Sequence, residues 1–286
     1  MMTRGNILSF TNQNGKTAYN PTIPFEFNGK KYMGIRAESL ESELDSQTLF
    51  AYEKDCEKDL WEIDYSLDSL PLQDPAYAKI KGEIFILGVK VNKEKDGMRW
   101  KQEIYRGDSI RNLEYFTSGP KGIKDIRLVD LKDRVGVFTR PNGKIAYLEV
   151  GNIEELGELS ESDWYNCPKI IMGLFEENLW GGVNQAIKIS PREIGIIGHI
   201  ASQSINGGNK LQKYYYGMSF KFNPKKLIKR DFKIIAKRND FPPSHAKRSP
   251  ELDDVIFPAG IEEKTNNFYC GLSDFCIGKK EIKDVF

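Results

Sequence analysis

Five stretches of this chain begin and end on residues that could take part in chemistry. Each has a polar opening residue, a short apolar strand, a polar turn, a second apolar strand and a polar closing residue. Because the two strands of a hairpin run in opposite directions, the closing residue returns to the end at which the unit opened. The openers are Asn20, Asp74, Asp125, Asn184 and Asp254, and the closers are Arg36, Lys90, Arg140, His199 and Asp274.

These residue types suit a reaction at a glycosidic bond. A carboxylic acid can protonate a sugar leaving group, and carboxylates also accept hydrogen bonds from sugar hydroxyls. Clustered lysine, arginine and histidine side chains bind an oxyanion such as phosphate. A hydrolase needs a second carboxylate to activate water, whereas phosphate is already an anionic nucleophile. The mixture of acids and cations therefore indicates phosphorolysis, with inorganic phosphate as co-substrate and no other cofactor.

The second unit shows how strands would hold such residues. Asp74 precedes Pro75, which restricts Asp74 to extended backbone geometry. The short strand AYAKI follows, then a turn at Lys81 and Gly82, and then the apolar strand EIFILGV. This arrangement predicts a hairpin that presents Asp74 at its open end.

The openers recur at the spacing of propeller blades, roughly every 50 to 70 residues. Segments between the units supply outer strands, for example MRWKQEIYRG, KIAYLEV, YYYGMSFKF and FKIIAKR. Helical signal is thin, and its best candidate is residues 152–164. We predict an all-β chain that forms a single catalytic domain over residues 1–286, a five-bladed β-propeller with openers and closers around one funnel.

Composition narrows the partners and the compartment. The 286 residues carry a formal net charge of +1, which argues against a nucleic-acid or anionic-membrane partner. No apolar run reaches transmembrane length, and the first residues lack the apolar core of a signal peptide. With two histidines and four cysteines that have no CxxC spacing, we expect no metal site and a cytoplasmic protein. The sequence leaves a monomer and a homo-oligomer open.

The order and spacing of these motifs resemble the mannoside phosphorylases of glycoside hydrolase family 130. They resemble still more closely the sister group, the β-mannosyltransferase/phosphorylases of glycosyltransferase family 108. The likeness spans nearly the whole chain and all five units. It rests on Asn20-Pro21, Asp74-Pro75, Arg140-Pro141, the WGG run at Trp180, the GH pair at His199, and the VIFPAG and LSD segments of the last unit.

Two positions depart from the pattern of these families. Ala76 stands where the phosphorylases usually carry an arginine after the DP pair. Lys124-Asp125 replaces their more usual pair of a basic residue and asparagine.

The resemblance implies roles for the residues of the funnel. Asp74 would be the general acid that protonates the glycosidic oxygen. Phosphate would be held by Lys124, Arg140 and His199. The sugar substrate would be bound by Asn20, Arg36, Asp125, Asn184 and Asp274.

The leading hypothesis is an inverting phosphorylase that reversibly cleaves β-mannosides with inorganic phosphate and releases α-mannose 1-phosphate. In the reverse direction it would extend mannose or a manno-oligosaccharide acceptor. One alternative is a β-glycoside hydrolase, in which Asp274 or Asp254 would supply the base. Two others are a sugar-nucleotide-dependent mannosyltransferase and a non-catalytic propeller that binds a sugar or a protein.

Several residues keep two interpretations at this stage. His199 stands alone on an apolar strand, as a satisfied core histidine would. Trp61 and Trp180 suit core packing or sugar stacking equally. Glu38 and Glu43 are either solvated loop acids or residues that close over a substrate. The basic run at residues 225–238 alternates with apolar residues, which favours the solvated face of an outer strand over a nucleic-acid site.

Overall fold

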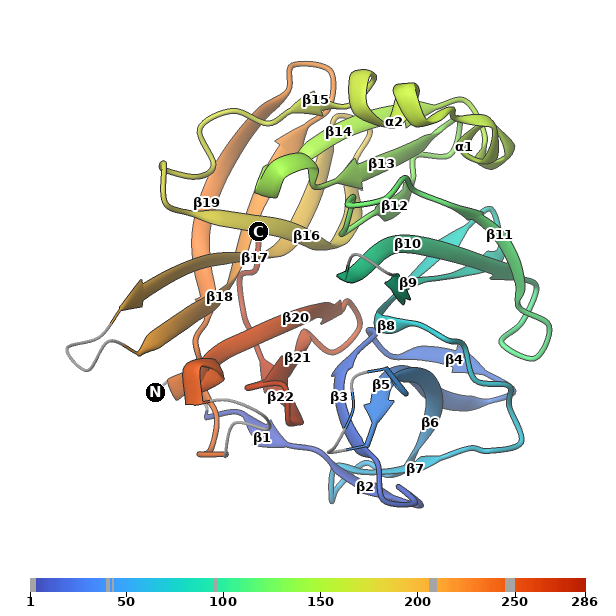
Figure 1. Ribbon diagram of the computed structural model, residues 1–286, viewed down its shortest axis with the longest axis vertical. Coiled ribbons are helices and arrows are strands. Elements are labelled where there is room, and N and C mark those ends of the chain that lie inside the picture. Colours follow the sequence, from blue (N-terminus) through green and yellow to red (C-terminus); the bar gives the residue numbers. More distant parts are fainter. Residues whose placement is uncertain (1–3, 40–41, 43, 95–96, 206–209, 245–249) are drawn as a thin grey trace.

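Strands dominate the structure and form sheets around a common centre (Figure 1). The computed structural model describes residues 4–39, 42, 44–94, 97–205, 210–244 and 250–286. Its strand content confirms the prediction of a β-rich fold. The predicted hairpin at Lys81-Gly82 is present, and its two strands pair antiparallel. Lys81 and Gly82 have φ angles of 50° and 96°, the positive values that a two-residue hairpin turn requires.

The first sheet has six strands in the order β2-β7-β6-β5-β3, with β4 beside β5. Its strands are β2 (Ser9–Thr11), β3 (Thr17–Pro21), β4 (Phe25–Phe27), β5 (Lys30–Glu38), β6 (Gln47–Asp55) and β7 (Leu60–Ile63). Tyr19 of β3 is paired with Arg36 of β5, so the opener Asn20 and the closer Arg36 lie at the same end of this hairpin.

The second and third sheets each have four strands. The second consists of β8 (Gln73–Ile80), β9 (Glu83–Glu94), β10 (Gly97–Gly107) and β11 (Glu114–Ser118). The third consists of β12 (Arg127–Asp130), β13 (Val135–Thr139), β14 (Ala146–Val150) and β15 (Lys169–Ile170). A short 3-10 helix at Pro141–Gly143 follows β13. Two predicted outer strands, MRWKQEIYRG and KIAYLEV, are thus found in β10 and β14.

The fourth sheet has eight strands and consists of two groups. One group is β16 (Trp180–Ser190), β17 (Glu193–Ile205), β18 (Leu211–Asn223) and β19 (Ile228–Ala236). The other is β20 (Asp254–Glu262), β21 (Asn267–Leu272), β22 (Cys276–Glu281) and β1 (Asn6–Ile7). Only two parallel residue pairs, Tyr214 with Asp254 and Tyr215 with Val255, join β18 to β20. Short 3-10 helices at Arg238–Asp240 and Pro250–Leu252 lie between the groups.

The first strands of the five units contact one another in a closed ring. β3 contacts β8, β8 contacts β12, β12 contacts β16, β16 contacts β20, and β20 contacts β3. This circular arrangement is propeller-like, although hydrogen-bonded pairing divides it into four sheets rather than five. The ring brings the ends of hairpins that are distant in sequence to one central region.

Apolar side chains fill the spaces between neighbouring sheets. Phe85 and Leu87 of the second sheet pack with Val137 of the third, and Phe138 of the third packs with Phe222 of β18. Residues predicted as the best helical segment form two short helices, α1 (Ile153–Glu158) and α2 (Glu161–Asn166), which cover the outside of this region. Successive side chains of a strand point to opposite faces of its sheet, so each sheet can present apolar side chains to the sheet on either side.

The two ends of the chain close the circle. The N-terminal strand β1 pairs with β22 of the last group, and the next strand, β2, pairs with β7 of the first sheet. At the other end, the Ser219 hydroxyl of β18 donates a hydrogen bond to the Val285 carbonyl over 2.6 Å. The pairings of β1 and β2 cover edges of β22 and β7 that would otherwise be open to another strand.

Candidate active site

Irregular backbone turns the opening residues towards the centre. The pairing register shifts across Asn20, Asp74 and Asn184, so these residues lie at β-bulges. A bulged residue is left out of the regular ladder, and its side chain is redirected. Asn20, Asp74 and Asp125 also have φ angles of 43°, 49° and 56°, in the left-handed region that Asn and Asp tolerate better than most residues. The polar openers are therefore suited to their backbone as well as to their chemistry.

The expectation of extended geometry at Asp74 is wrong. Its φ angle is 49°, although Pro75 follows and disfavours helical backbone angles at the preceding residue. Such sparsely populated conformations cost on the order of 1–3 kcal/mol and persist only when surrounding contacts hold them. The hydrogen bonds of the Asp74 carboxylate are the contacts that do so here.

Asp74 lies in a group of polar side chains that we name the Asp74 cluster. Its Oδ1 atom accepts hydrogen bonds from Asn20 Nδ2 at 2.8 Å and from Arg36 Nη1 at 3.1 Å. Asn20 Nδ2 also lies 3.4 Å from Asp274 Oδ1. The Asp74 side chain remains 25% exposed, and its Oδ2 has no hydrogen-bond partner among the described residues. One carboxylate oxygen is thus fixed by two donors, and the other has no such contact within the described part of the chain.

Glu38 completes the Asp74 cluster. It binds the Arg36 guanidinium behind the atom that contacts Asp74. Arg36 Nε and Nη2 donate to Glu38 Oε2 at 3.1 and 2.9 Å, and the Tyr19 hydroxyl donates to Glu38 Oε1 at 2.6 Å. Burial alone would lower the pKa of Arg36, but Asp74, Tyr19 and Glu38 raise it above its ordinary value. Arg36 therefore stays charged.

Sequence reasoning missed this role of Glu38. We had expected either a solvated loop acid or a residue that closes over substrate, yet Glu38 is fully buried in an ion pair. The available signal was its spacing, because Arg36 and Glu38 are two residues apart on one strand and so share a face. Glu43 lies outside the described residues.

A second group of side chains, the Arg140 cluster, contains Asp125, Arg140, Asn184 and His199. Arg140 Nη1 lies 3.0 Å from Asp125 Oδ2 and 3.1 Å from His199 Nε2, and His199 Nδ1 lies 2.9 Å from Asn184 Oδ1. Burial would raise the pKa of Asp125, but the cationic Arg140 and the neighbouring Arg127 lower it below its usual value. Asp125 is therefore an ionised carboxylate that is already paired.

His199 is a neutral residue behind Arg140. Burial lowers its pKa to about 3, and the cationic Arg140 and Arg127 act in the same direction while Asp125 opposes them. Because a guanidinium can only donate, Nε2 of His199 is the acceptor, and Nδ1 carries the proton that is donated to Asn184. His199 is fully buried and lies against Arg140, and its predicted contact with phosphate stays a prediction.

Lys124 links the two clusters electrostatically. Its charge interacts with Asp74 and Arg36 on one side and with Arg140 and Asp125 on the other. Burial lowers the pKa of Lys124, and the two arginines add to this effect. The Nζ atom lies 4.6 Å from the centroid of the Trp100 ring, where the aromatic face attracts a cation.

Two of the predicted openers and closers lie outside these clusters. Asp254 is paired with Tyr214 at the short parallel contact between β18 and β20. Lys90 is paired with Lys101 on the neighbouring strand and lines a small cavity together with Gln73. Ala76, the first departure from the family pattern, packs in the apolar core between the second and third sheets, where an arginine would be an unpaired buried charge.

Other residues with two interpretations are resolved by burial. Trp61 is 1% exposed and belongs to the core of the first sheet. Trp180 is half-buried, and its Nε1 donates to the Tyr215 hydroxyl at 3.2 Å. The basic run is largely β19, an outer strand with mostly exposed or half-buried side chains, as predicted.

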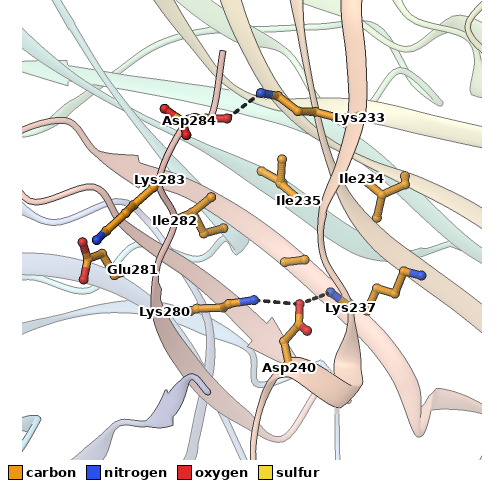
Figure 2. A pocket seen from close by; sticks show the side chains of 11 residues that line it. Lys233, Ile234, Ile235, Lys237, Asp240, Lys280, Glu281, Ile282, Lys283 and Asp284 are labelled. Atoms are coloured by element: carbon orange, nitrogen blue, oxygen red, sulfur yellow. Dashed lines mark hydrogen bonds and ion pairs between the residues drawn. The ribbon is translucent and has the colours of Figure 1, made fainter. Parts of the chain in front are cut away.

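A cavity of about 680 Å³ lies away from both clusters, between β19 and the C-terminal segment (Figure 2). Two of its lysines have partners in the cavity wall, and one of these partners is a carboxylate. Lys280 lies 3.0 Å from Asp240, and Lys233 donates to the Asp284 carbonyl (Figure 2). None of the residues with predicted roles lines this cavity, so we assign the candidate active site to the two clusters despite its size.

In the part of the chain that the structure describes, no group of three or more His, Cys, Asp or Glu side chains is arranged to hold a metal ion. Among the same residues, no helix combines the length and apolar character needed to cross a membrane.

The strands define a propeller-like fold that solved glycoside hydrolases also have. The catalytic domain of an α-L-arabinofuranosidase of glycoside hydrolase family 62 from Coprinopsis cinerea shares the fold, with a TM-score of 0.56. It is 12% identical, and the match covers 99% of this chain and 98% of that one. At this identity the likeness concerns the fold alone.

The chain belongs to the family described as protein of unknown function DUF1861, whose model matches residues 1–286. It is similar to MPT-4, a mannose phosphorylase from Leishmania mexicana solved with a phosphate ion, at 30% identity and a TM-score of 0.89. It is also similar to MPT-1, a GDP-Man-dependent mannosyltransferase from the same organism, at 29% identity and a TM-score of 0.91. These matches cover the whole of this chain and 90% and 91% of those chains. No curated protein matches.

Proposed function

We propose that this protein is an inverting phosphorylase that transfers a mannosyl unit between a β-mannoside and inorganic phosphate. The observation that carries the proposal is the difference in charge between the two clusters. Asp74 offers one partly exposed acid, while Arg140 and Lys124 offer cations beside it. The similarity to a mannose phosphorylase that binds phosphate supports the sugar and the anion.

In the proposed reaction, phosphate attacks the anomeric carbon from the side opposite the leaving group. The bond from the anomeric carbon to the glycosidic oxygen breaks, a bond to a phosphate oxygen forms, and Asp74 gives its proton to the leaving oxygen. The products are α-mannose 1-phosphate and the shortened mannoside or mannose. Asn20, Arg36 and Asp274 would bind hydroxyls of the mannosyl unit, since they surround the acid.

The cationic side would hold phosphate through Lys124 and Arg140. We assign His199 and Asn184 to positioning, because His199 accepts from Arg140 Nη1 and Asn184 accepts from His199. Asp125 would orient the same guanidinium and stay ionised. In this scheme the buried neutral histidine leaves the charge of Arg140 available to the phosphate.

We also propose that the chain forms five blades within one catalytic domain. The ring of five first strands supports this count, as does the weak junction of only two residue pairs within the eight-stranded sheet. Each blade would then supply one hairpin end to the central region.

A second candidate is a mannosyltransferase that uses GDP-mannose. It is favoured by the likeness to MPT-1, which is as close as the likeness to the phosphorylase. A hydrolase has less support. An inverting hydrolase places its carboxyl groups far enough apart to hold a water molecule across the sugar, whereas Asp74 and Asp274 both contact one amide nitrogen of Asn20.

The test is a donor comparison with purified protein and mannose or manno-oligosaccharide acceptors. The proposal expects phosphate release from α-mannose 1-phosphate, mannoside products, and no such release by Asp74→Asn. Release of GDP from GDP-mannose without any use of α-mannose 1-phosphate would instead support the transferase. Hydrolysis of β-mannosides at an undiminished rate without phosphate would overturn both.

A further inference from the structure

The hairpin of β9 and β10 continues beyond the Asp74 cluster and carries two exposed apolar side chains. Trp100 is 39% exposed and Met98 is 41% exposed. Burial of either side chain against a ligand would be favourable, because it removes apolar surface from water. Both lie on β10 two residues apart, so they share a face of the strand. Two large apolar side chains thus share one exposed face, and a cation, Lys124, lies against one of them.

The same face of β10 is tied to the segment that carries Lys124 and Asp125. Gln102 is fully buried; its Nε2 donates to the Ile126 carbonyl at 3.2 Å, and its Oε1 accepts from the Ile126 N–H at 2.8 Å. Two residues along, the Trp100 carbonyl accepts from the Gly122 N–H at 3.0 Å. The backbone of Trp100 therefore has a set position relative to Lys124.

Lys124 connects this face to the acid. Its ammonium group lies over the Trp100 ring and interacts electrostatically with Asp74. Trp100 therefore lies beside the lysine that directly precedes Asp125 of the Arg140 cluster. In the proposed reaction the group that Asp74 protonates is the acceptor sugar, which enters and leaves through the same central region.

We propose that Trp100 and Met98 form the acceptor platform, on which successive sugar units of a manno-oligosaccharide lie. This inference rests on the proposed function and names the part of the site that binds the acceptor. The apolar C–H face of a pyranose ring stacks on the Trp100 indole, whose large area and N–H suit a ligand that is part apolar and part polar. Met98 lies two residues further along, about 6.6 Å at strand spacing, and contacts the next sugar unit.

The first experiment measures acceptor and donor dependence separately in the synthetic direction. Trp100→Ala should raise the acceptor KM roughly tenfold or more, while Trp100→Phe keeps most of the affinity. Tyr115→Ala is the matched control, because Tyr115 is an exposed aromatic residue of the same sheet, on β11. An unchanged acceptor KM in Trp100→Ala overturns the platform. An equal rise of the acceptor KM and the α-mannose 1-phosphate KM also overturns it, because Trp100 would then only support Lys124.

The second experiment uses acceptor length. Met98→Ala should weaken a disaccharide or trisaccharide acceptor several-fold and leave free mannose unchanged, because mannose occupies only the Trp100 position. Loss of affinity for mannose and the longer acceptors alike would contradict the assigned order of the two positions. A thermal melt of each variant confirms that it is folded.

A binding measurement separates this inference from the proposed function. Asp74→Asn protein is titrated with mannobiose and, separately, with GDP, and intrinsic tryptophan fluorescence is followed. Mannobiose should change the fluorescence, and Trp100→Phe in the same background should abolish that change, even where no donor supports turnover. Absence of mannobiose binding overturns the platform. A Trp100-dependent response to GDP but not to mannobiose also overturns it, since the ring would then belong to a donor base.

Discussion

The Asp74 and Arg140 clusters use the same construction with opposite electrostatic results. Each has an arginine bonded to an aspartate in front and to a fully buried residue behind. Behind Arg36 the buried residue is the carboxylate of Glu38, whereas behind Arg140 it is the neutral ring of His199. Arg36 is therefore paired with two carboxylates, whereas among the described residues Arg140 is paired with that of Asp125 alone and has the cation Lys124 nearby.

The difference teaches how one central region can hold both a proton donor and an anion. A cation already neutralised by two carboxylates gains little from a phosphate, because the anion would meet negative charge. A cation backed by a neutral acceptor remains attractive to phosphate, and a charge-assisted hydrogen bond to it is among the stronger ones available. In the proposed scheme, the residue behind each arginine thus determines what binds in front of it.

The largest expected effect comes from removing the rear carboxylate of the Asp74 cluster. Glu38→Ala leaves Arg36 with an unmatched buried charge and should lower the free energy of unfolding by about 3–5 kcal/mol. Chemical denaturation measures this loss. Glu154→Ala, which removes a solvent-exposed ion pair with Arg106, should cost less than about 1 kcal/mol. Equal losses in the two variants would show that the Arg36–Glu38 pair contributes no more than an ordinary surface pair.

Asp74→Asn should lower the turnover number at least about 100-fold, the lower end of what general acid catalysis contributes. The amide keeps the shape of the side chain, so folding and sugar binding are expected to persist. Phosphate release from α-mannose 1-phosphate with a mannoside acceptor, beside a thermal melt of both proteins, measures the effect. A variant that melts like the parent and retains its rate would exclude Asp74 as the acid, and Asp125 would be the next carboxylate to test.

Arg140→Ala tests the other cluster. Loss of a charge-assisted partner should weaken phosphate binding by roughly 1.5–3 kcal/mol, which is about 10- to 150-fold in the phosphate KM. The KM for the mannoside should change much less, because Arg140 contacts the sugar side of the site only through other residues. Phosphate dependence that matches the parent's would remove Arg140 from the anion site.

The smallest effect concerns the neutral His199. Its pKa in the folded state is about 3, below the value near 6.5 expected after unfolding, so the unfolded chain binds the proton first as the pH falls. Stability should therefore be fully present above about pH 6.5 and decline towards pH 3, by at most about 1.4 kcal/mol per pH unit from this group. Urea unfolding at pH 7, 6 and 5 measures the slope. His199→Gln should have a shallower slope than the parent, and identical slopes would indicate that His199 is charged in the folded protein.

Much of the local structure could be predicted because it depends on residues close in sequence. Alternation of apolar and polar side chains determined the strands, and the Lys81-Gly82 turn determined a hairpin. The same alternation favoured an outer strand over a nucleic-acid site for the basic run, and this run is largely β19. Strand periodicity is a property of each segment, so it does not require knowledge of what packs against it.

Which hairpin ends meet was decided by the tertiary structure. Asn20 contacts Asp74 and Asp274, which lie 54 and 254 residues further along, and the circular ring of inner strands makes both contacts possible. Asp254 and Lys90 matched the same sequence pattern but lie elsewhere, because pairing with β18 and β10 determines their positions. The pattern showed which residues end a hairpin, but not which ends are neighbours.

The sequence by itself determined the β-rich class, the hairpins and the residue types that the candidate site would use. Only the tertiary structure decided the left-handed backbone of Asp74, the burial of Glu38 and the neutral state of His199. Each of these depends on partners from other strands that outweigh a local preference. Pro75 favours extended backbone at Asp74, yet hydrogen bonds from Asn20 and Arg36 hold the other conformation. A carboxylate and an imidazole favour water, yet buried partners satisfy them away from it.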